Sequence, residues 1–244
     1  MSLHSRFSKF NDISASQHKR KSNKRNPIKT MNNQKTYLFD FDGTLVDSMP
    51  AFVSLMQRIL NEYGMECDED MVKIITPLGY GGTAEYFCSL GIRSTKDELV
   101  KLMNEYARDD YLYNIPQKSG TVKTLTEMKK RGKCLNVLTA SPHTVLDPCL
   151  KRLGLFELFD NVWSCDDFET TKTDPEIYKM AAKRLNTDIE NIVFVDDNVN
   201  AVKTARLCGM KSYGIYDSSS KDYIEQMKTV SDRYIYELSE LLDE

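Results

Sequence analysis

The sequence lacks the features that would assign the chain to a membrane or secreted class. No run of its 244 residues approaches the roughly 18 consecutive apolar residues that a membrane-spanning helix needs. The start of the chain carries basic residues but no apolar segment after them, so it does not resemble a secretory signal peptide. We therefore expect a cytoplasmic protein without a membrane partner.

Paired cysteines and nucleotide-binding motifs are also missing. The six cysteines are scattered, none forms a C-x-x-C pair, and most lie in apolar segments, which indicates reduced thiols rather than disulfides or a zinc site. The glycine-rich stretch Gly79–Thr83 does not match G-x-G-x-x-G, and no Walker lysine motif is present. The D-x-D-G sequence from Asp40 to Gly43 places its glycine too early for an EF-hand loop.

Charge is distributed unevenly along the chain. Residues 1–30 hold eight Lys or Arg and one acid, whereas the remaining 214 residues hold 25 basic and 35 acidic residues. The polar, basic stretch 1–30 shows no apolar periodicity, so we expect a disordered tail. It is either a basic arm for nucleic acid, membrane or targeting, or an expendable extension, which we favour. The acidic remainder argues against nucleic-acid binding.

The apolar pattern divides the rest of the chain into an α/β core and a helical insertion. After a first strand at 36–41, helical patterns cover 50–64, 68–75, 83–90 and 95–113, and no strand alternation occurs between 50 and 115. Strands and helices then alternate from 116 to the end, which predicts a doubly wound, mainly parallel, Rossmann-like sheet. The further strands are expected at 134–139, 161–165, 191–195, 211–216 and 232–236. The helices between and after them are expected at 121–131, 142–153, 175–185, 200–208, 220–227 and 238–242.

Three of these strands end in polar residues suited to chemistry. Asp40 and Asp42 follow the first strand, Thr139 ends the second, and Asp196 and Asp197 follow the strand at 191–195. Sites in open α/β sheets lie at the carboxyl ends of strands, near a topological switch. Acids at the end of a buried strand are costly unless they are compensated, and a divalent metal is the simplest compensator.

These residues resemble the haloacid dehalogenase superfamily, specifically its phosphatases with a helical cap after the first strand. D-F-D-G-T-L-V-D-S resembles the first motif, V-L-T-A-S the second, Lys172 in T-K-T-D-P-E-I-Y the third and V-F-V-D-D-N the fourth. The pattern is most similar to the phosphoglycolate-phosphatase-like group. The resemblance implies a core of 31–49 and 116–244, an all-helical cap of 50–115, and a cytoplasmic monomer or homodimer acting on a small phosphorylated metabolite.

The resemblance also implies roles for individual residues. Asp40 would be the nucleophile, Asp42 the general acid and base, and Thr139 and Lys172 would hold the phosphoryl group. Mg²⁺ would bind Asp40, the backbone carbonyl of Asp42 and Asp196, and Asp197 would either support the metal or cap the next helix. Further expectations are a surface position for His143, capping or supporting roles for Asn198 and Asn200, capping by Asp47 and Ser48, and cap specificity residues among Lys73, Arg93 and Arg108.

Two other functions share the same scaffold. A sugar-phosphate mutase similar to beta-phosphoglucomutase would carry basic residues in the cap segment that Gly79–Thr83 resembles, and this chain has none there. A catalytically silent binding module would have lost catalytic residues, whereas every position here holds a competent type. Asp42 favours phosphomonoester hydrolysis or sugar-phosphate mutation, because the haloacid dehalogenases, phosphonate hydrolases and transport ATPases of this superfamily lack an aspartate at this position.

Overall fold

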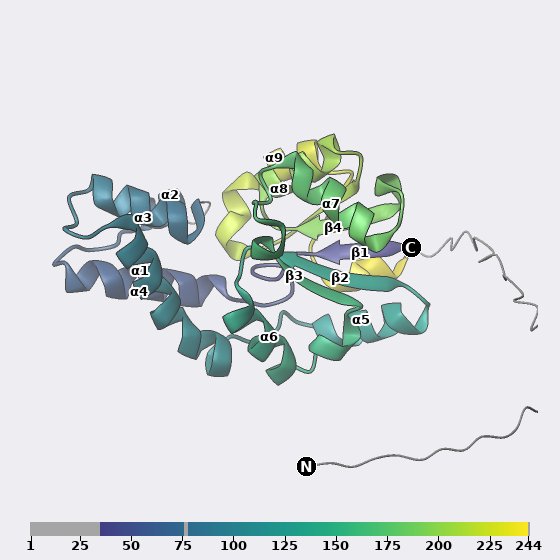
Figure 1. Ribbon diagram of the computed structural model, residues 1–244, viewed down its shortest axis with the longest axis horizontal. Coiled ribbons are helices and arrows are strands. Elements are labelled where there is room, and N and C mark those ends of the chain that lie inside the picture. Colours follow the sequence, from purple (N-terminus) through teal and green to yellow (C-terminus); the bar gives the residue numbers. More distant parts are fainter. Residues whose placement is uncertain (1–34, 76–77, 244) are drawn as a thin grey trace, which may run out of the picture. The chain divides into compact units, whose positions relative to one another are not determined.

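The computed structural model describes residues 35–75 and 78–243, and the side chains of residues 69 and 73 lie outside that description. The expected basic tail at 1–30 also lies outside the described residues. Six strands form one parallel sheet in the order β3-β2-β1-β4-β5-β6 (Figure 1). They are β1 (Thr36–Phe39), β2 (Cys134–Thr139), β3 (Asn161–Ser164), β4 (Ile192–Asp196), β5 (Lys211–Ile215) and β6 (Arg233–Ile235). The predicted doubly wound α/β fold is therefore confirmed.

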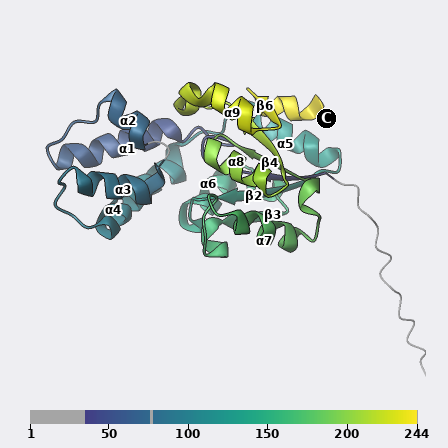
Figure 2. The same ribbon diagram turned by 90° about the horizontal axis from the view of Figure 1, so that it is seen from above.

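Helices cover both faces of this sheet. The core helices are α5 (Thr121–Lys130), α6 (His143–Arg152), α7 (Pro175–Leu185), α8 (Val199–Leu207) and α9 (Ile224–Val230). Tyr37 and Phe39 of β1 pack in one cluster with α5 and α6, while Leu38 packs in a second cluster with α7 and α8. Alternate side chains of a strand point to opposite faces, so β1 is buried on both sides. Helix α8 contacts β4 and β5 (Figure 2).

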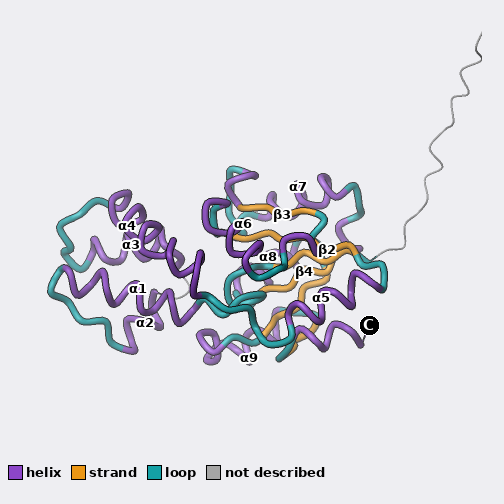
Figure 3. Tube along the Cα trace, turned by 90° about the horizontal axis from the view of Figure 1, so that it is seen from below, coloured by secondary structure: helices purple, strands orange, loops and turns teal. Residues whose placement is uncertain are grey.

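The described part of the segment between β1 and α5 consists of helices joined by loops, as Figure 3 shows. It contains α1 (Met49–Glu62), α2 (Glu69–Ile75), α3 (Gly79–Ser89), α4 (Lys96–Asp109) and a π-helical turn, η2 (Asp110–Asn114). Thr95 and Glu98 form the expected capping box at the start of α4. Among the described residues, no helix has the length and apolar character to cross a membrane.

Several predicted boundaries were wrong. Strand β1 ends at Phe39 rather than at residue 41, although the Asp40 N–H still donates to the Val195 carbonyl at 2.9 Å. Helix α3 begins at Gly79, so the glycine-rich stretch forms its first turns rather than a loop before it. The helix predicted through residue 113 leaves the α-helical geometry after Asp109. The last predicted helix is a 3₁₀ helix, Leu238–Asp243.

The expected capping of α1 was also wrong. Ser48 occupies the N-cap position, but its backbone is helical and its side chain makes no capping hydrogen bond. The residue is buried, and its hydroxyl lies near the Asp42 carboxyl, where it opposes the rise in the pKa of Asp42 instead of capping α1. Pro50 in the first turn removes one of the donors that a cap would satisfy, which lowers the need for a capping side chain.

Candidate active site

The carboxyl ends of β1, β2 and β4 meet at one edge of the sheet. Strand β1 lies between β2 and β4, and Phe39 is in register with both Val137 and Val195. Asp40 follows Phe39 directly, and Thr139 and Asp196 are the last residues of the two neighbouring strands. The chain passes from β1 to β2 on one side and later returns to β4 on the other, so these residues flank a topological switch point.

Lys172 joins two of these carboxylates. Its ammonium nitrogen lies 2.7 Å from Asp40 Oδ1 and 2.7 Å from Asp196 Oδ2, and the side chain is 12% exposed. Burial disfavours the charged ammonium, but the adjacent carboxylates of Asp196 and Asp40 outweigh it and raise the pKa of Lys172 well above its usual value. The structure therefore holds a permanent positive charge between the two strand ends.

The loop that carries Lys172 is held by a buried tyrosine. The Tyr178 hydroxyl lies 2.8 Å from the Lys172 carbonyl and 3.1 Å from the Ala201 carbonyl. Tyr178 is on α7 and Ala201 on α8, so one side chain ties the lysine loop to the helix after Asp196. This tether restrains the lysine loop through a side chain.

Asp40, Asp196 and Asp197 form a cluster suited to a divalent cation. Each offers one carboxylate oxygen, and these oxygens lie within 4.8 Å of one another. Burial, followed by the charge of Asp40, raises the pKa of Asp196 to about 7. Burial and the charge of Asp196 likewise raise the pKa of Asp197. Lys172 compensates only part of this negative charge, and oxygen ligands of this kind fit Mg²⁺.

A glycine makes room for Asp197. Gly43 has a φ of +72°, and a Cβ at this position would lie 2.5 Å from Asp197 Oδ2. The next residue, Thr44, donates its hydroxyl to Asp197 Oδ1 at 3.0 Å. The Gly43–Thr44 turn thus both admits Asp197 and orients it. Asn198 rather than Asp197 caps α8, because its side chain accepts hydrogen bonds from the Asn200 and Ala201 N–H groups.

We expect Gly43→Ala to displace Asp197 and to weaken metal binding. The matched control is Gly64→Ala, because Gly64 has a similar φ of +70° with no atom within 4 Å of its virtual Cβ. Both variants pay the cost of a left-handed backbone, roughly 1–2 kcal/mol. Urea unfolding and the Mg²⁺-dependent rise in melting temperature measure the two effects. An equal metal response in both variants would contradict the role assigned to Gly43.

Asp42 is held separately from the metal cluster. Its Oδ1 accepts a hydrogen bond from the Tyr111 hydroxyl at 2.6 Å, and its Oδ2 lies 2.5 Å from the Ser141 hydroxyl. Burial and the charge of Asp40 raise the pKa of Asp42, which favours the protonated form that a general acid requires. Thr139 Oγ1 accepts the Ser141 N–H at 3.1 Å and fixes the turn after β2.

Sequence reasoning missed Tyr111 and Ser141. Ser141 lies in V-L-T-A-S, two residues after Thr139, so the motif contained a signal for it. Tyr111 lay within a predicted cap helix and had no local signal. The other expected residues do not join the cluster. His143 is half-exposed, and its ring nitrogens lie 2.7 Å from Asp147 and 2.9 Å from Asp167. Arg93 and Arg108 are exposed, and the Lys73 side chain is outside the described residues.

Comparison with known proteins assigns the family. Residues 37–215 match the family model described as haloacid dehalogenase-like hydrolase. Pyrophosphatase PpaX of Bacillus velezensis is 30% identical over 73% of this chain and 81% of its own length. An N-acetylmuramic acid 6-phosphate phosphatase of Pseudomonas putida is 26% identical over 74% of this chain and 82% of its own length.

A solved structure supports the same fold. The crystal structure of a predicted phosphoglycolate phosphatase from Haemophilus somnus superimposes with a TM-score of 0.74. It is 20% identical in sequence and covers 87% of this chain and 98% of its own. The chain belongs to the haloacid dehalogenase-like hydrolases, and the family prediction is confirmed.

Proposed function

We propose that this haloacid dehalogenase-like hydrolase is a Mg²⁺-dependent phosphatase that hydrolyses a small phosphate monoester through an aspartyl-phosphate intermediate. The observation that carries the proposal is the division of the acids into two sets. Asp40 and Asp196 share the Lys172 ammonium, while Asp42 is held apart by two hydroxyls. The names of the two relatives described above support hydrolysis of a phosphorylated small molecule.

Asp40 and Asp42 divide the chemistry. An Asp40 carboxylate oxygen attacks phosphorus, the bond from phosphorus to the ester oxygen breaks, and protonated Asp42 gives its proton to the departing alkoxide. Asp42 then takes a proton from water as the water oxygen attacks the aspartyl phosphate. The bond between phosphorus and the Asp40 oxygen breaks, which releases inorganic phosphate and restores both side chains.

Lys172 and Thr139 would hold the phosphoryl group during both steps. The Lys172 ammonium lies against Asp40 and would neutralise charge on the nucleophile and the phosphoryl oxygens. The Thr139 hydroxyl and main-chain N–H groups near it would donate hydrogen bonds to the remaining phosphoryl oxygens. Mg²⁺ would be held by Asp40, Asp196 and the Asp42 carbonyl with support from Asp197, and it would supply further positive charge at the phosphoryl group.

Removal of divalent metal tests the metal assignment. We expect an excess of EDTA to abolish turnover of p-nitrophenyl phosphate, because the cluster of carboxylates repels an incoming phosphate dianion. Added Mg²⁺ should restore the initial rate, while added Ca²⁺ should restore little, because its larger size relaxes the octahedral geometry. Unchanged turnover after exhaustive chelation and dialysis would contradict a metal-dependent mechanism.

A phosphatase screen over a metabolite library tests the activity itself. The panel should hold phosphoglycolate, hexose and pentose phosphates, nucleotides and pyrophosphate, with release of inorganic phosphate as the readout. Asp40→Asn serves as the blank, because it removes the nucleophile and keeps the fold. Turnover of at least one ester by the wild type alone supports the proposal, and none across the panel favours a binding module.

The mutase alternative has weaker support. A mutase must hold a second phosphate on the cap, and the first turn of α3 carries no charge in Gly79–Thr83. Tyr80 in this turn stacks on Phe52 of α1, with ring centroids 5.9 Å apart. The cap surface there is aromatic rather than cationic. We propose that the cap, predicted at 50–115, closes over the site and admits an uncharged substrate tail past Tyr80.

A further inference from the structure

Two hydroxyls from distant parts of the chain hold the Asp42 carboxyl. Tyr111 reaches it from the π-helical turn η2, and Ser141 reaches it from the turn after β2. The two hydroxyl oxygens lie 3.5 Å from each other, so they contact the carboxyl side by side. The proposed chemistry requires Asp42 to bind and release one proton in each turnover, and nothing in that chemistry accounts for Tyr111.

The main chain of Tyr111 is fastened to the core. Arg152 on α6 donates from Nη2 to the Tyr111 carbonyl at 3.2 Å and to the Ile115 carbonyl at 2.5 Å. A π-helical turn contains one more residue than an α-helical turn, so it leaves carbonyls without their usual partners and re-aims the side chains. Arg152 satisfies these carbonyls and fixes the turn against α6.

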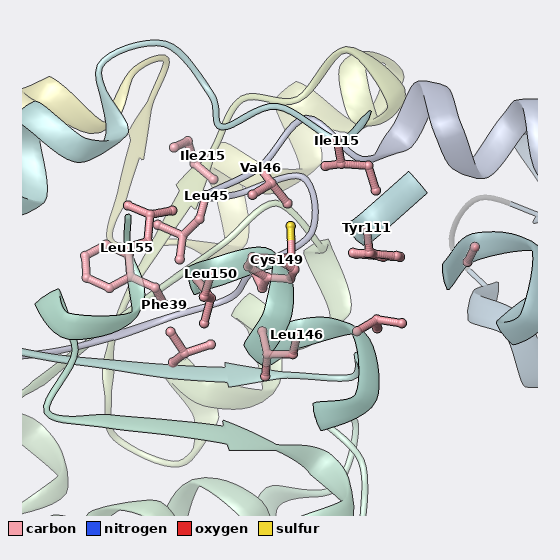
Figure 4. Packing of buried hydrophobic residues seen from close by; sticks show 14 of the residues in the cluster. Phe39, Leu45, Val46, Tyr111, Ile115, Leu146, Cys149, Leu150, Leu155 and Ile215 are labelled. Atoms are coloured by element: carbon pink, nitrogen blue, oxygen red, sulfur yellow. The ribbon is translucent and has the colours of Figure 1, made fainter. Parts of the chain in front are cut away.

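The Tyr111 side chain is fixed as well. It is 8% exposed, and its ring stacks on Phe41 with centroids 6.2 Å apart. Figure 4 shows Tyr111 and Ile115 beside Cys149 of α6 and Val46 of the loop after β1, and all four residues belong to one buried cluster. The hydroxyl therefore has a defined position relative to Asp42, set by packing of the ring and by anchoring of the main chain.

We propose that Tyr111 is a positioning residue for proton transfer by Asp42. Its hydroxyl donates to Oδ1, while the Ser141 hydroxyl at Oδ2 can turn from donor to acceptor when that oxygen is protonated. Oδ2 is then the oxygen that carries the proton to the leaving group and recovers it from water. Tyr111 keeps its own proton throughout. This inference rests on the proposed phosphatase function and names a residue that the sequence motifs do not contain.

The role proposed for Tyr111 predicts that the loss of rate on removing its hydroxyl depends on the leaving group. p-Nitrophenol is a stronger acid than phenol, so p-nitrophenolate departs without a proton from the enzyme. A phenolate or an alkoxide needs the proton of Asp42 as the ester bond breaks. Loss of the Tyr111 hydroxyl frees the Asp42 carboxyl to rotate, so proton transfer becomes slow. Formation of the bond to Asp40 is unaffected, because no hydrogen bond, ion pair or ring contact joins Tyr111 to Asp40 or Lys172 in the described part of the chain.

Tyr111→Phe tests the inference, because it removes one oxygen and keeps the stacked ring. We compare kcat/KM, which reports the steps up to departure of the leaving group and excludes the later hydrolysis of the aspartyl phosphate that both esters share. We expect kcat/KM for phenyl phosphate to fall by roughly 10- to 100-fold, a part of what general acid catalysis contributes, and kcat/KM for p-nitrophenyl phosphate to fall by less than about 3-fold. Tyr106→Phe is the matched control, because Tyr106 lies on α4 and bonds to Glu62 at an exposed position. It should leave both rates unchanged.

The Asp42→Asn variant distinguishes failure of the role proposed for Tyr111 from failure of the general-acid assignment of Asp42. If Asp42→Asn shows the split between the two esters and Tyr111→Phe lowers both rates equally or neither, the positioning role is overturned and the proposed function stands. If Asp42→Asn shows no split, the general acid assignment fails, and the role of Tyr111 fails with it. Wild-type protein inactive on both aryl esters and across the metabolite panel overturns the proposed function. Thermal melting confirms that each variant is folded.

Discussion

Asp40→Asn should reduce turnover of any phosphate ester by at least about 10⁴-fold, in the range found when the nucleophile of a covalent mechanism is removed. An amide oxygen neither attacks phosphorus at a useful rate nor carries the charge that binds the cation. The charge of Asp40 raises the pKa of the buried Asp196, so replacing Asp40 by Asn also relieves repulsion between the two carboxylates. The folded state should therefore survive, and the loss of activity will not reflect unfolding.

Steady-state kinetics on a substrate from the screen, with urea unfolding in parallel, measures both effects. Asp188→Asn is the control, because Asp188 is exposed and makes no side-chain capping hydrogen bond. It should keep wild-type kcat. Full activity in Asp40→Asn would refute the nucleophile assignment, whereas a variant that binds Mg²⁺ normally yet is inactive would separate attack on phosphorus from metal binding.

Lys172→Met should lower both stability and activity, and metal should restore only the first. Without the ammonium, the carboxylates of Asp40 and Asp196 remain buried and uncompensated. Removing one partner of a buried ion pair typically costs about 3–5 kcal/mol, so we expect the metal-free protein to lose free energy of unfolding in that range. Mg²⁺ replaces part of the lost positive charge and should therefore recover much of the stability.

At saturating Mg²⁺, kcat of the Lys172→Met variant should remain roughly 10²- to 10³-fold below that of the wild type. The reason is that one preorganised positive group at the transferring phosphoryl is gone. Urea unfolding with and without Mg²⁺, together with kcat at saturating Mg²⁺, gives the comparison. Lys179→Met removes an exposed lysine that pairs with Glu176, and it should change little. Recovery of wild-type kcat at high Mg²⁺ would show that Lys172 acts only as a structural counter-ion.

The strand ends were predictable because local pattern and chain order define them. A short apolar run that stops at Asp40, and another that stops at Asp196, required no knowledge of long-range contacts. The parallel sheet then brings these ends to one edge. Lys172 needed the family resemblance, since a single lysine before a helix is common, and its position between two carboxylates arises only from the packing of α7 and α8 against β4.

Tyr111 could not be predicted, because its role depends on a departure from regular geometry. The residues from Asp110 to Asn114 continue the helical pattern of α4, so the sequence indicates one uninterrupted helix. Arg152, from a segment far along the chain, donates to the carbonyl of Tyr111 within the π-helical turn and to that of Ile115 just after it. The predicted start of α3 was wrong for a similar reason, because glycine is a poor helix former and tertiary packing overrode its preference.

The anchoring of η2 by Arg152 separates the choice of substrate from the position of the proton-transferring group. Although Tyr111 follows the cap helices in sequence, its main chain is bound to α6, so we place the mechanical boundary of the cap near Asp109 rather than at residue 115. Under the proposed function, substitutions in α1–α4 would alter which substrate fits while the Asp42 carboxyl stays where it is. Sequence changes confined to the proposed cap could then give such a chain new substrates without altering its proton-transfer chemistry.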